Sequence, residues 1–274
     1  MSALAPESFG PFSIVAAPHR VRDFVVATGD DPERWTDHAP PGFAAVALIA
    51  VASALFERAM TRYAAVVHTR QRFDWEGPLE VGRTLEVTGE IISARDRSGT
   101  TLVEFAAAAP GWMTSTSHFL MAETSAAELA ELVEPSPDAR AHSEVPTPQR
   151  VPEVGEALPV LAKSASRSDI LRYAAASGDW NPIHWDHQTA VAAGLGGVIA
   201  HGLLSASWIA QAAARFSARP DPLGYLDLRF RSPLRPNVPA IVGGTVASVA
   251  PLALDQAITV AGDVAVSARA QVNE

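Results

Sequence analysis

The stretch Tyr173-Ala-Ala-Ala-Ser177-Gly178-Asp179-Trp180-Asn181-Pro182-Ile183-His184 holds a carboxylate and an imidazole five residues apart around a forced turn. Asn181-Pro182 stops a preceding helix, because proline has no N–H and disfavours helical backbone in the residue before it. The chain must bend there, so we expect Asp179 and His184 to lie on the same side of the turn. A carboxylate and an imidazole that face one small space suit general acid–base chemistry.

The composition is that of an ordinary globular protein, with 274 residues of which 48% are hydrophobic and 19% are charged. This length suffices for two modest domains or one large one. The formal net charge of -9 argues against nucleic acid and anionic membranes as main partners. The chain has no cysteine, which excludes disulfides, zinc–thiolate sites and cysteine nucleophiles.

Two features lead us to expect a cytoplasmic protein that does not enter a membrane. The first six residues lack the basic and apolar regions of a signal peptide. The apolar run over residues 43–56 is shorter than the roughly 20 residues that a membrane span needs. Pro40-Pro41-Gly42 and Glu57-Arg58 close this run on its two sides, so we interpret it as a buried core helix.

The first half reads as helices followed by strands. Residues 1–20 are rich in proline and predict an irregular arm, after which a helical pattern runs from Val21 to Gly29-Asp30. Alternating β-forming residues then predict antiparallel strands, with a hairpin turn at Asp96-Arg97-Ser98-Gly99. The predicted strands cover residues 66–73, 84–91, 101–105 and 114–121.

A proline-rich segment divides the chain. Residues 122–153 contain one helical pattern, over 122–133, and then two proline pairs that are typical of a stiff, extended linker. We therefore predict an N-terminal domain over residues 1–121, a linker over 122–153 and a C-terminal domain over 154–274.

The second half repeats the order of helices and then strands. We expect a helix over residues 168–176, a short helix capped by Asp186, and a long apolar helix that opens at His201-Gly202. The predicted strands cover residues 226–230, 240–249 and 255–272, the last in one or two pieces.

Short ordered matches between the halves indicate an internal duplication. The matching residues lie before the long apolar helix of each half and at the start of a strand that follows it. The segment between Gly-Asp and Arg-Phe is eight residues longer in the second half than in the first. The matches are Thr28-Gly29-Asp30 with Ser177-Gly178-Asp179, Gly42 with Gly202, and Arg72-Phe73…Pro78-Leu79 with Arg229-Phe230…Pro233-Leu234.

Ser-Gly-Asp-x-Asn-Pro-Ile-His, followed by Val198-Ile-Ala-His-Gly202, resembles the signature of the MaoC-like (R)-specific enoyl-CoA hydratases and 3-hydroxyacyl-thioester dehydratases. The match spans about 30 residues. It implies an α+β double hot-dog fold, in which two antiparallel sheets each wrap a central helix and together form the active site. The first half lacks Asn-Pro-x-His after Gly29-Asp30, so we predict one site per chain, in the second half.

The resemblance implies reversible hydration of a trans-2-enoyl thioester. Asp179 and His184 would hold and activate the water, and Asn181 would fix the turn or the carboxylate by hydrogen bonding. The backbone N–H of Gly202 would stabilise the thioester oxygen, because the first N–H groups of a helix are unpaired. Packing or hydrogen bonding is the other interpretation of several of the candidate substrate-binding residues. Those candidates are Tyr173, Ser177, Trp180, Ile199 and His201.

No metal or cofactor is expected. Gly194-Leu-Gly196-Gly197 is too short for a dinucleotide-binding fingerprint and does not follow a strand. His184 and His187 have a spacing that metal ligands use, but the sequence suggests no third ligand.

Two other functions stay open at this point. The same fold could serve a hot-dog thioesterase, or a non-catalytic subunit that binds an acyl thioester. In each case the ligand would be an acyl-CoA or an acyl-carrier-protein thioester. Because such folds assemble through their sheets, we expect a homodimer.

Overall fold

Helices and strands of the first half follow the predicted order, after one strand that the sequence analysis did not predict. The computed structural model describes residues 4–122 and 152–274. The first half contains β1 (Ser8–Val15), α1 (Pro18–Thr28), η1 (Pro41–Phe43), α2 (Ala44–Ala59), β2 (Ala65–Trp75), β3 (Thr84–Arg97), β4 (Thr100–Ala109) and β5 (Met113–Ala122).

The second half repeats this arrangement with two added short helices, η2 and α4, in front of its long apolar helix. The region 255–272 forms two strands. The second half contains β6 (Leu161–Lys163), α3 (Arg167–Ser177), η2 (Pro182–His184), α4 (His187–Ala192), α5 (Gly202–Ala214), β7 (Leu223–Phe230), β8 (Ala240–Val249), β9 (Leu252–Val260) and β10 (Asp263–Val272).

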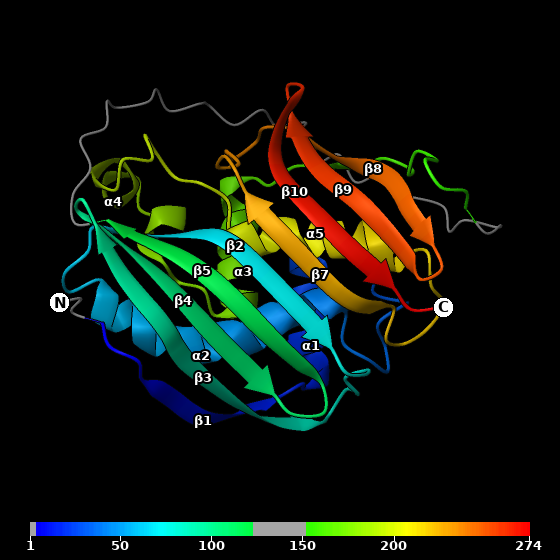
Figure 1. Ribbon diagram of the computed structural model, residues 1–274, viewed down its shortest axis with the longest axis horizontal. Helices are drawn as coiled ribbons and strands as arrows, with labels where there is room; N and C mark the ends of the chain where they lie inside the picture. Colours follow the sequence, from blue (N-terminus) through cyan, green and yellow to red (C-terminus); the bar gives the residue numbers. More distant parts are fainter. Residues whose placement is uncertain (1–3, 123–151) are drawn as a thin grey trace.

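The strands form one antiparallel sheet in the order β1-β3-β4-β5-β2-β7-β10-β9-β8-β6. Figure 1 shows this sheet as a curved layer with α2 and α5 behind it. Helix α2 contacts β1 to β5, and α5 contacts β7 to β10. The predicted α+β double hot-dog fold is therefore confirmed, and the two half-sheets are joined edge to edge through β2 and β7.

The pairing of β2 with β7 supports the duplication that the sequence indicates. Aligning Phe73 with Phe230 gives an offset of 157 residues, and the same offset carries Gln71 to Leu228. Gln71 and Leu228 are direct partners across the two strands. Equivalent residues face each other only where a two-fold axis passes, so this axis passes through the seam between the half-sheets.

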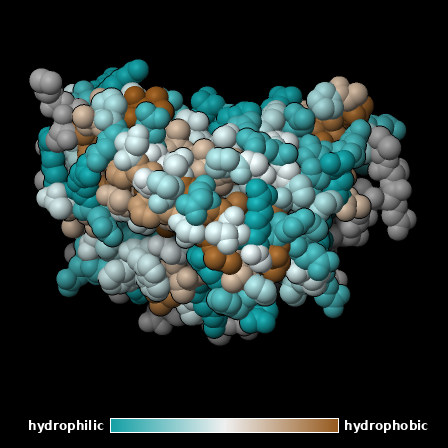
Figure 2. Space-filling view, turned by 90° about the horizontal axis from the view of Figure 1, so that it is seen from below, coloured by the Kyte–Doolittle hydropathy of each residue, from teal (hydrophilic) through white to brown (hydrophobic). Residues whose placement is uncertain are grey.

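Helix α2 belongs to the core, as its sequence predicts. The segment Pro41–Ala59 is long and apolar enough to cross a membrane by length and composition alone, but 61% of it is buried inside the protein. A helix that is apolar on all sides needs such surroundings. The face seen in Figure 2 is mostly hydrophilic, and its hydrophobic residues lie in separate groups.

Glycines end the two equivalent helices that precede the Gly-Asp pairs. Gly29 and Gly178 follow α1 and α3 with φ of 63° and 82°, a left-handed backbone that favours glycine. The predicted hairpin turn is also present. Ser98 and Gly99 connect β3 to β4 with positive φ at both positions, as a tight hairpin of this type requires.

The prediction of an irregular arm over residues 1–20 is wrong. Residues 8–15 form β1, which pairs with β3, and both Phe9 and Ile14 are buried. Gly10-Pro11 and a register shift between Phe9 and Phe12 interrupt the alternation that would have revealed the strand. Helix α1 also begins earlier than predicted, at Pro18, a residue that suits the first turn of a helix.

The helix predicted over 122–133 and the proline-rich linker lie outside the described residues, apart from their ends. The proposed domain boundary therefore stays a prediction.

Leu55 tests the burial of α2. This side chain is fully buried on the helix, so Leu55→Ala is expected to lower the free energy of unfolding by about 2–5 kcal/mol through lost contacts and a cavity. Glu57→Ala, two residues along on the exposed side, should change it by less than about 0.5 kcal/mol. Chemical denaturation measures both, and equal effects would contradict a buried α2.

Candidate active site

Asp179 is placed by the end of α3. This helix begins with a capping box between Ser166 and Asp169 and ends at Gly178. The left-handed glycine turns the chain sharply, and the N–H of Asp179 then donates to Ser177 Oγ at 3.2 Å. As a result the Asp179 side chain enters the protein interior, where the residue is only 9% exposed.

Asn181 holds the turn and ties it to the first half. Its Nδ2 donates to the carbonyl of Val66 on β2 at 3.2 Å, and its Oδ1 accepts from the N–H of Ile183 at 3.4 Å. Its own N–H donates to Asp179 Oδ1 at 3.3 Å. Asn181 therefore links the turn through hydrogen bonds to the Asp179 carboxylate and to β2.

His184 has a defined tautomer. Its Nδ1 lies 2.9 Å from the carbonyl oxygen of Ile199. A carbonyl only accepts, so Nδ1 carries the proton and the Nε2 of the neutral ring keeps a lone pair. His184 thus offers a proton acceptor at Nε2.

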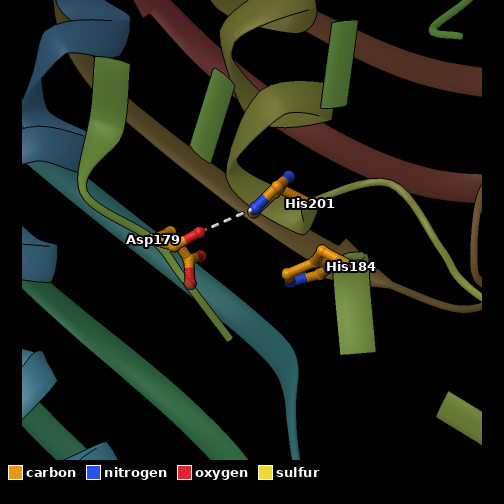
Figure 3. A group of neighbouring side chains, drawn as sticks. All are labelled: Asp179, His184 and His201. Atoms are coloured by element: carbon orange, nitrogen blue, oxygen red, sulfur yellow. Dashed lines mark hydrogen bonds between the residues drawn. The ribbon is translucent and has the colours of Figure 1, made fainter. Parts of the chain in front are cut away.

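His201 supports both catalytic candidates. Its Nε2 donates to the main-chain carbonyl of Asp179 at 3.0 Å, and its ring stacks on His184 with centroids 3.8 Å apart. Figure 3 shows the three side chains converging from the loop after α3, from η2 and from the start of α5. His201 therefore fixes the Asp179 backbone and supports one face of the His184 ring.

Helix α5 begins at Gly202 without a side-chain cap. The first N–H groups of such a helix lack partners within it and carry partial positive charge. A Cβ on Gly202 would lie 3.3–3.5 Å from the ring of Phe230. The glycine therefore leaves space between the helix start and this ring.

Asp179, His184, His201 and Gly202 all line one cavity of about 230 Å³. It occupies the fork where β2 and β7 separate, because their pairing ends at Arg70 and Arg229. The second half contributes Asp179, Asn181, Ile183, His184, Leu195, Ile199, Ala200, His201, Gly202, Leu203, Ser205, Phe230, Arg231, Ser232, Pro233, Leu234 and Val266.

Of the predicted substrate-binding residues, Ile199 and His201 line this cavity and the other three do not. Tyr173 is fully buried and packs on the His201 ring, with centroids 4.9 Å apart. Ser177 donates to the Tyr173 carbonyl at 2.7 Å. Trp180 is 54% exposed. These three residues therefore shape the turn or lie on the surface.

The site residues predicted from the sequence all lie in the second half of the chain. The wall of the cavity includes eight residues of the first half, because the fork in the seam brings β2 and α2 against the catalytic turn. The first half contributes Leu48, Ile49, Phe56, Val66, Val67, His68, Thr69 and Phe119.

The equivalent position in the first half is filled. Trp35 Nε1 donates to Asp30 Oδ2 at 3.0 Å, and the space around them measures about 10 Å³. Lys163 Nζ donates to the Gly29 carbonyl at 2.7 Å. A Cβ on Gly42 would lie 2.7 Å from Ser207 Oγ, so this glycine permits close packing where Gly202 leaves open space. The described residues that line this space include no histidine, so Asp30 lacks the imidazole that accompanies Asp179.

Burial dominates the protonation of the site. It raises the pKa of Asp179, while His184 and the Asn181 N–H act in the opposite direction. It lowers the pKa of His184, which Asp179 counteracts in part. Burial and the neighbouring His184 hold the pKa of His201 well below its usual value. Both histidines are therefore neutral at pH 7.

Asp179, His184 and His201 also form the geometry of a candidate metal site. Their ligand atoms lie within 4.8 Å of one another, and His187, which the sequence spacing paired with His184, is not among them. One nitrogen of each ring is already engaged by a carbonyl. These hydrogen bonds hold both rings as neutral imidazoles. Measuring activity in the presence of a chelator tests whether a metal takes part.

The raised pKa of Asp179 predicts that charge at this position destabilises the fold. At a pH above the pKa that Asp179 has in the folded protein, its ionised form is less favourable in the folded protein than in the unfolded chain, which lowers the free energy of unfolding. This loss of stability disappears as the pH falls below the ordinary carboxyl pKa of about 4. Asp179→Asn is therefore expected to raise the melting temperature at pH 7, with a gain that shrinks toward pH 4. Thermal unfolding across this range measures it, with Asp23→Asn on the exposed surface as the control. A loss of stability at pH 7 would contradict the prediction.

Family models match both halves of the chain. Residues 144–265 match the MaoC-like domain, and residues 3–115 match the dehydratase domain region of a FAS1-like family. No protein of curated function matches the sequence at a significant level.

Solved structures share the whole double fold. A MaoC-like dehydratase has a TM-score of 0.78 at 21% identity, covering 98% of this chain and 97% of the other. A Mycobacterium tuberculosis protein described as a double hotdog fold has a TM-score of 0.69 at 14% identity, covering 99% and 96%. A putative oleoyl thioesterase from Lactobacillus plantarum has a TM-score of 0.58 at 13% identity, covering 99% and 97%, so the fold alone does not decide the reaction.

Each of the two family matches covers one half of the chain, and each half forms one half-sheet of the structure. The protein thus has a double hot-dog fold whose second half carries a MaoC-like domain.

Proposed function

We propose that this protein catalyses the reversible hydration of a trans-2-enoyl thioester to an (R)-3-hydroxyacyl thioester. One observation carries the proposal. The Asp179 carboxylate and the free Nε2 of His184 are two proton acceptors in one cavity, whose wall also includes the start of α5. The MaoC-like match over the second half supports the same class of reaction.

Asp179 and His184 together can orient one water molecule, because a water has two O–H donors and each group accepts one. As the water oxygen bonds to Cβ of the substrate, its proton passes to Nε2 of His184. The resulting imidazolium, next to the Asp179 carboxylate, then returns a proton to Cα on the same face. Water is thereby added across the double bond with no other reagent, and the reverse sequence removes it.

The start of α5 supplies the third requirement of this reaction. Negative charge develops on the thioester oxygen while Cβ is attacked, and the backbone N–H of Gly202 can stabilise it. Removing one such donor typically costs about 3–4 kcal/mol of activation free energy in other enzymes. Neither a metal nor an organic cofactor is required, and the thioester can belong to CoA or to a carrier protein.

Asp179→Asn and His184→Ala test the proposed roles. Each is expected to lower kcat/KM with crotonyl-CoA by at least about 100-fold, since each removes a proton acceptor. The loss of enoyl absorbance measures hydration, and the assay contains EDTA to show that no accessible metal is needed. Asp23→Asn and His19→Ala, both on the exposed surface, are matched controls that should retain full rates.

The same assay separates the alternatives. Release of free thiol would identify a thioesterase, and tight binding of several enoyl thioesters without turnover would identify a binding subunit. Full activity of Asp179→Asn would overturn the proposed mechanism.

Gly202→Ala tests the helix start. The added methyl group would press on the Phe230 ring, so we expect kcat to fall by about tenfold or more through misplacement of the thioester, while the fold is kept. Gly42→Ala is the matched variant in the first half. It should cost about 1–3 kcal/mol of stability through overpacking against Ser207 and leave kcat of the folded protein nearly unchanged. The opposite pattern would argue against a special role for Gly202.

A further inference from the structure

The first half contributes two polar side chains to the cavity wall, His68 and Thr69. The Thr69 hydroxyl donates to the His118 carbonyl at 2.9 Å, which leaves His68. It lies on β2, in the half of the protein that lacks the catalytic motif, and it lines the cavity. Its Nε2 is buried and has no hydrogen-bond partner among the described residues. A buried polar group without a partner is unfavourable, so this nitrogen calls for an explanation.

A β-bulge aims His68 inward. Gln71 and Phe73 are buried on the inner face of β2, and regular alternation would place residue 69 beside them and His68 on the outer face. The register between β2 and β5 shifts between His68 and Arg70, leaving Thr69 as the extra residue. Bulges of this kind reorient side chains, often next to active sites.

Aromatic rings hold His68 in this orientation. Its partner across the strands is Phe119, and the two ring centroids lie 4.6 Å apart. On the other strand of the fork, Phe230 lies 5.2 Å from the His68 ring. Phe230 is also the ring that Gly202 faces. His68 therefore lies one aromatic ring away from the expected position of the thioester.

The ring of His68 is uncharged in this place. Burial lowers the pKa of His68 to about 3, although the Gln71 side chain and the Arg70 backbone act against this change. Gln71 is itself held by Ser117, whose Oγ donates to Gln71 Oε1 at 2.6 Å. A neutral imidazole forms a directed hydrogen bond and does not attract a counter-ion.

We propose that His68 binds an oxygen on the acyl chain of the substrate, so that the preferred substrate is a short or medium-length enoyl thioester with a hydroxyl or keto group beyond the double bond. The inference rests on the proposed hydratase function and names its substrate class. The cavity of about 230 Å³ is smaller than the roughly 300–1,000 Å³ that is typical of ligand pockets, which favours a short or medium-length acyl group.

The test compares hex-2-enoyl-CoA with its 5-hydroxy and 6-hydroxy derivatives. We expect the better hydroxylated substrate to have a kcat/KM at least about tenfold above that of the plain one, because a site built for a hydroxyl group discriminates against a substrate that lacks it. His68→Leu should remove this preference, because it should lower kcat/KM with the hydroxylated substrate by at least about tenfold more than kcat/KM with hex-2-enoyl-CoA. His68→Gln, which keeps a polar group near the same place, should retain part of it. His118→Leu is the matched control, because this histidine lies on the adjacent strand and does not line the cavity.

Several outcomes would overturn the inference while the hydratase function stands. One is an equal rate with plain and hydroxylated substrates in the native protein. Another is a uniform rise in KM for every CoA thioester in His68→Leu, which would place the hydrogen bond on the pantetheine arm. Calorimetry with hexanoyl-CoA and 6-hydroxyhexanoyl-CoA decides the point even without turnover, since equal Kd values would reject the subsite. Absence of turnover with all three enoyl substrates, together with preferential binding of the hydroxylated ligand, would reject the hydratase function and leave the subsite.

Discussion

The antiparallel pairing of β2 with β7 is the interaction on which the rest of the structure depends. A half-sheet alone would leave the backbone groups of its edge strand unpaired, and the seam satisfies both edges at once. The seam also creates the site, because the two strands separate beyond Arg70 and Arg229 and the cavity lies in the fork. The hydrogen bond from Asn181 to the Val66 carbonyl then fixes the turn that carries Asp179 against the first half. The candidate site of one half thus has residues of the other half in its wall.

Sequence reasoning succeeded where a local rule determined the structure. The proline after Asn181 and the left-handed glycine before Asp179 required a turn, and the turn brings Asp179 near His184. Helix α2 was predicted to be a buried core helix from its apolar run over residues 43–56, which Pro40-Pro41-Gly42 and Glu57-Arg58 close on its two sides. The repeated Gly-Asp and Arg-Phe pairs predicted the equivalence of the halves, which the direct pairing of Gln71 with Leu228 supports.

Other features depend on contacts that a sequence does not display. The equivalent position in the first half is filled by the indole of Trp35, which donates a hydrogen bond to Asp30 from five residues along the chain. The inward position of His68 follows from one unpaired residue, Thr69, and counting alternate residues would have assigned it to solvent. Strand β1 was not predicted because Gly10-Pro11 interrupts its alternation of buried and exposed residues. His201 looked like one more candidate for binding, yet its contacts with the Asp179 carbonyl and the His184 ring make it a support for both.

The closure of the first-half site by Trp35 has a consequence for how such a protein can arise. In an assembly of two identical hot-dog subunits, a tryptophan that fills one site fills its copy as well, and all activity is lost together. Once both units are part of one polypeptide, they are present in a fixed one-to-one ratio but mutate independently. One unit is then free to exchange its catalytic groups for a wall shaped to a particular acyl chain. Covalent fusion therefore converts a symmetric enzyme into one whose halves can divide catalysis and selectivity between them.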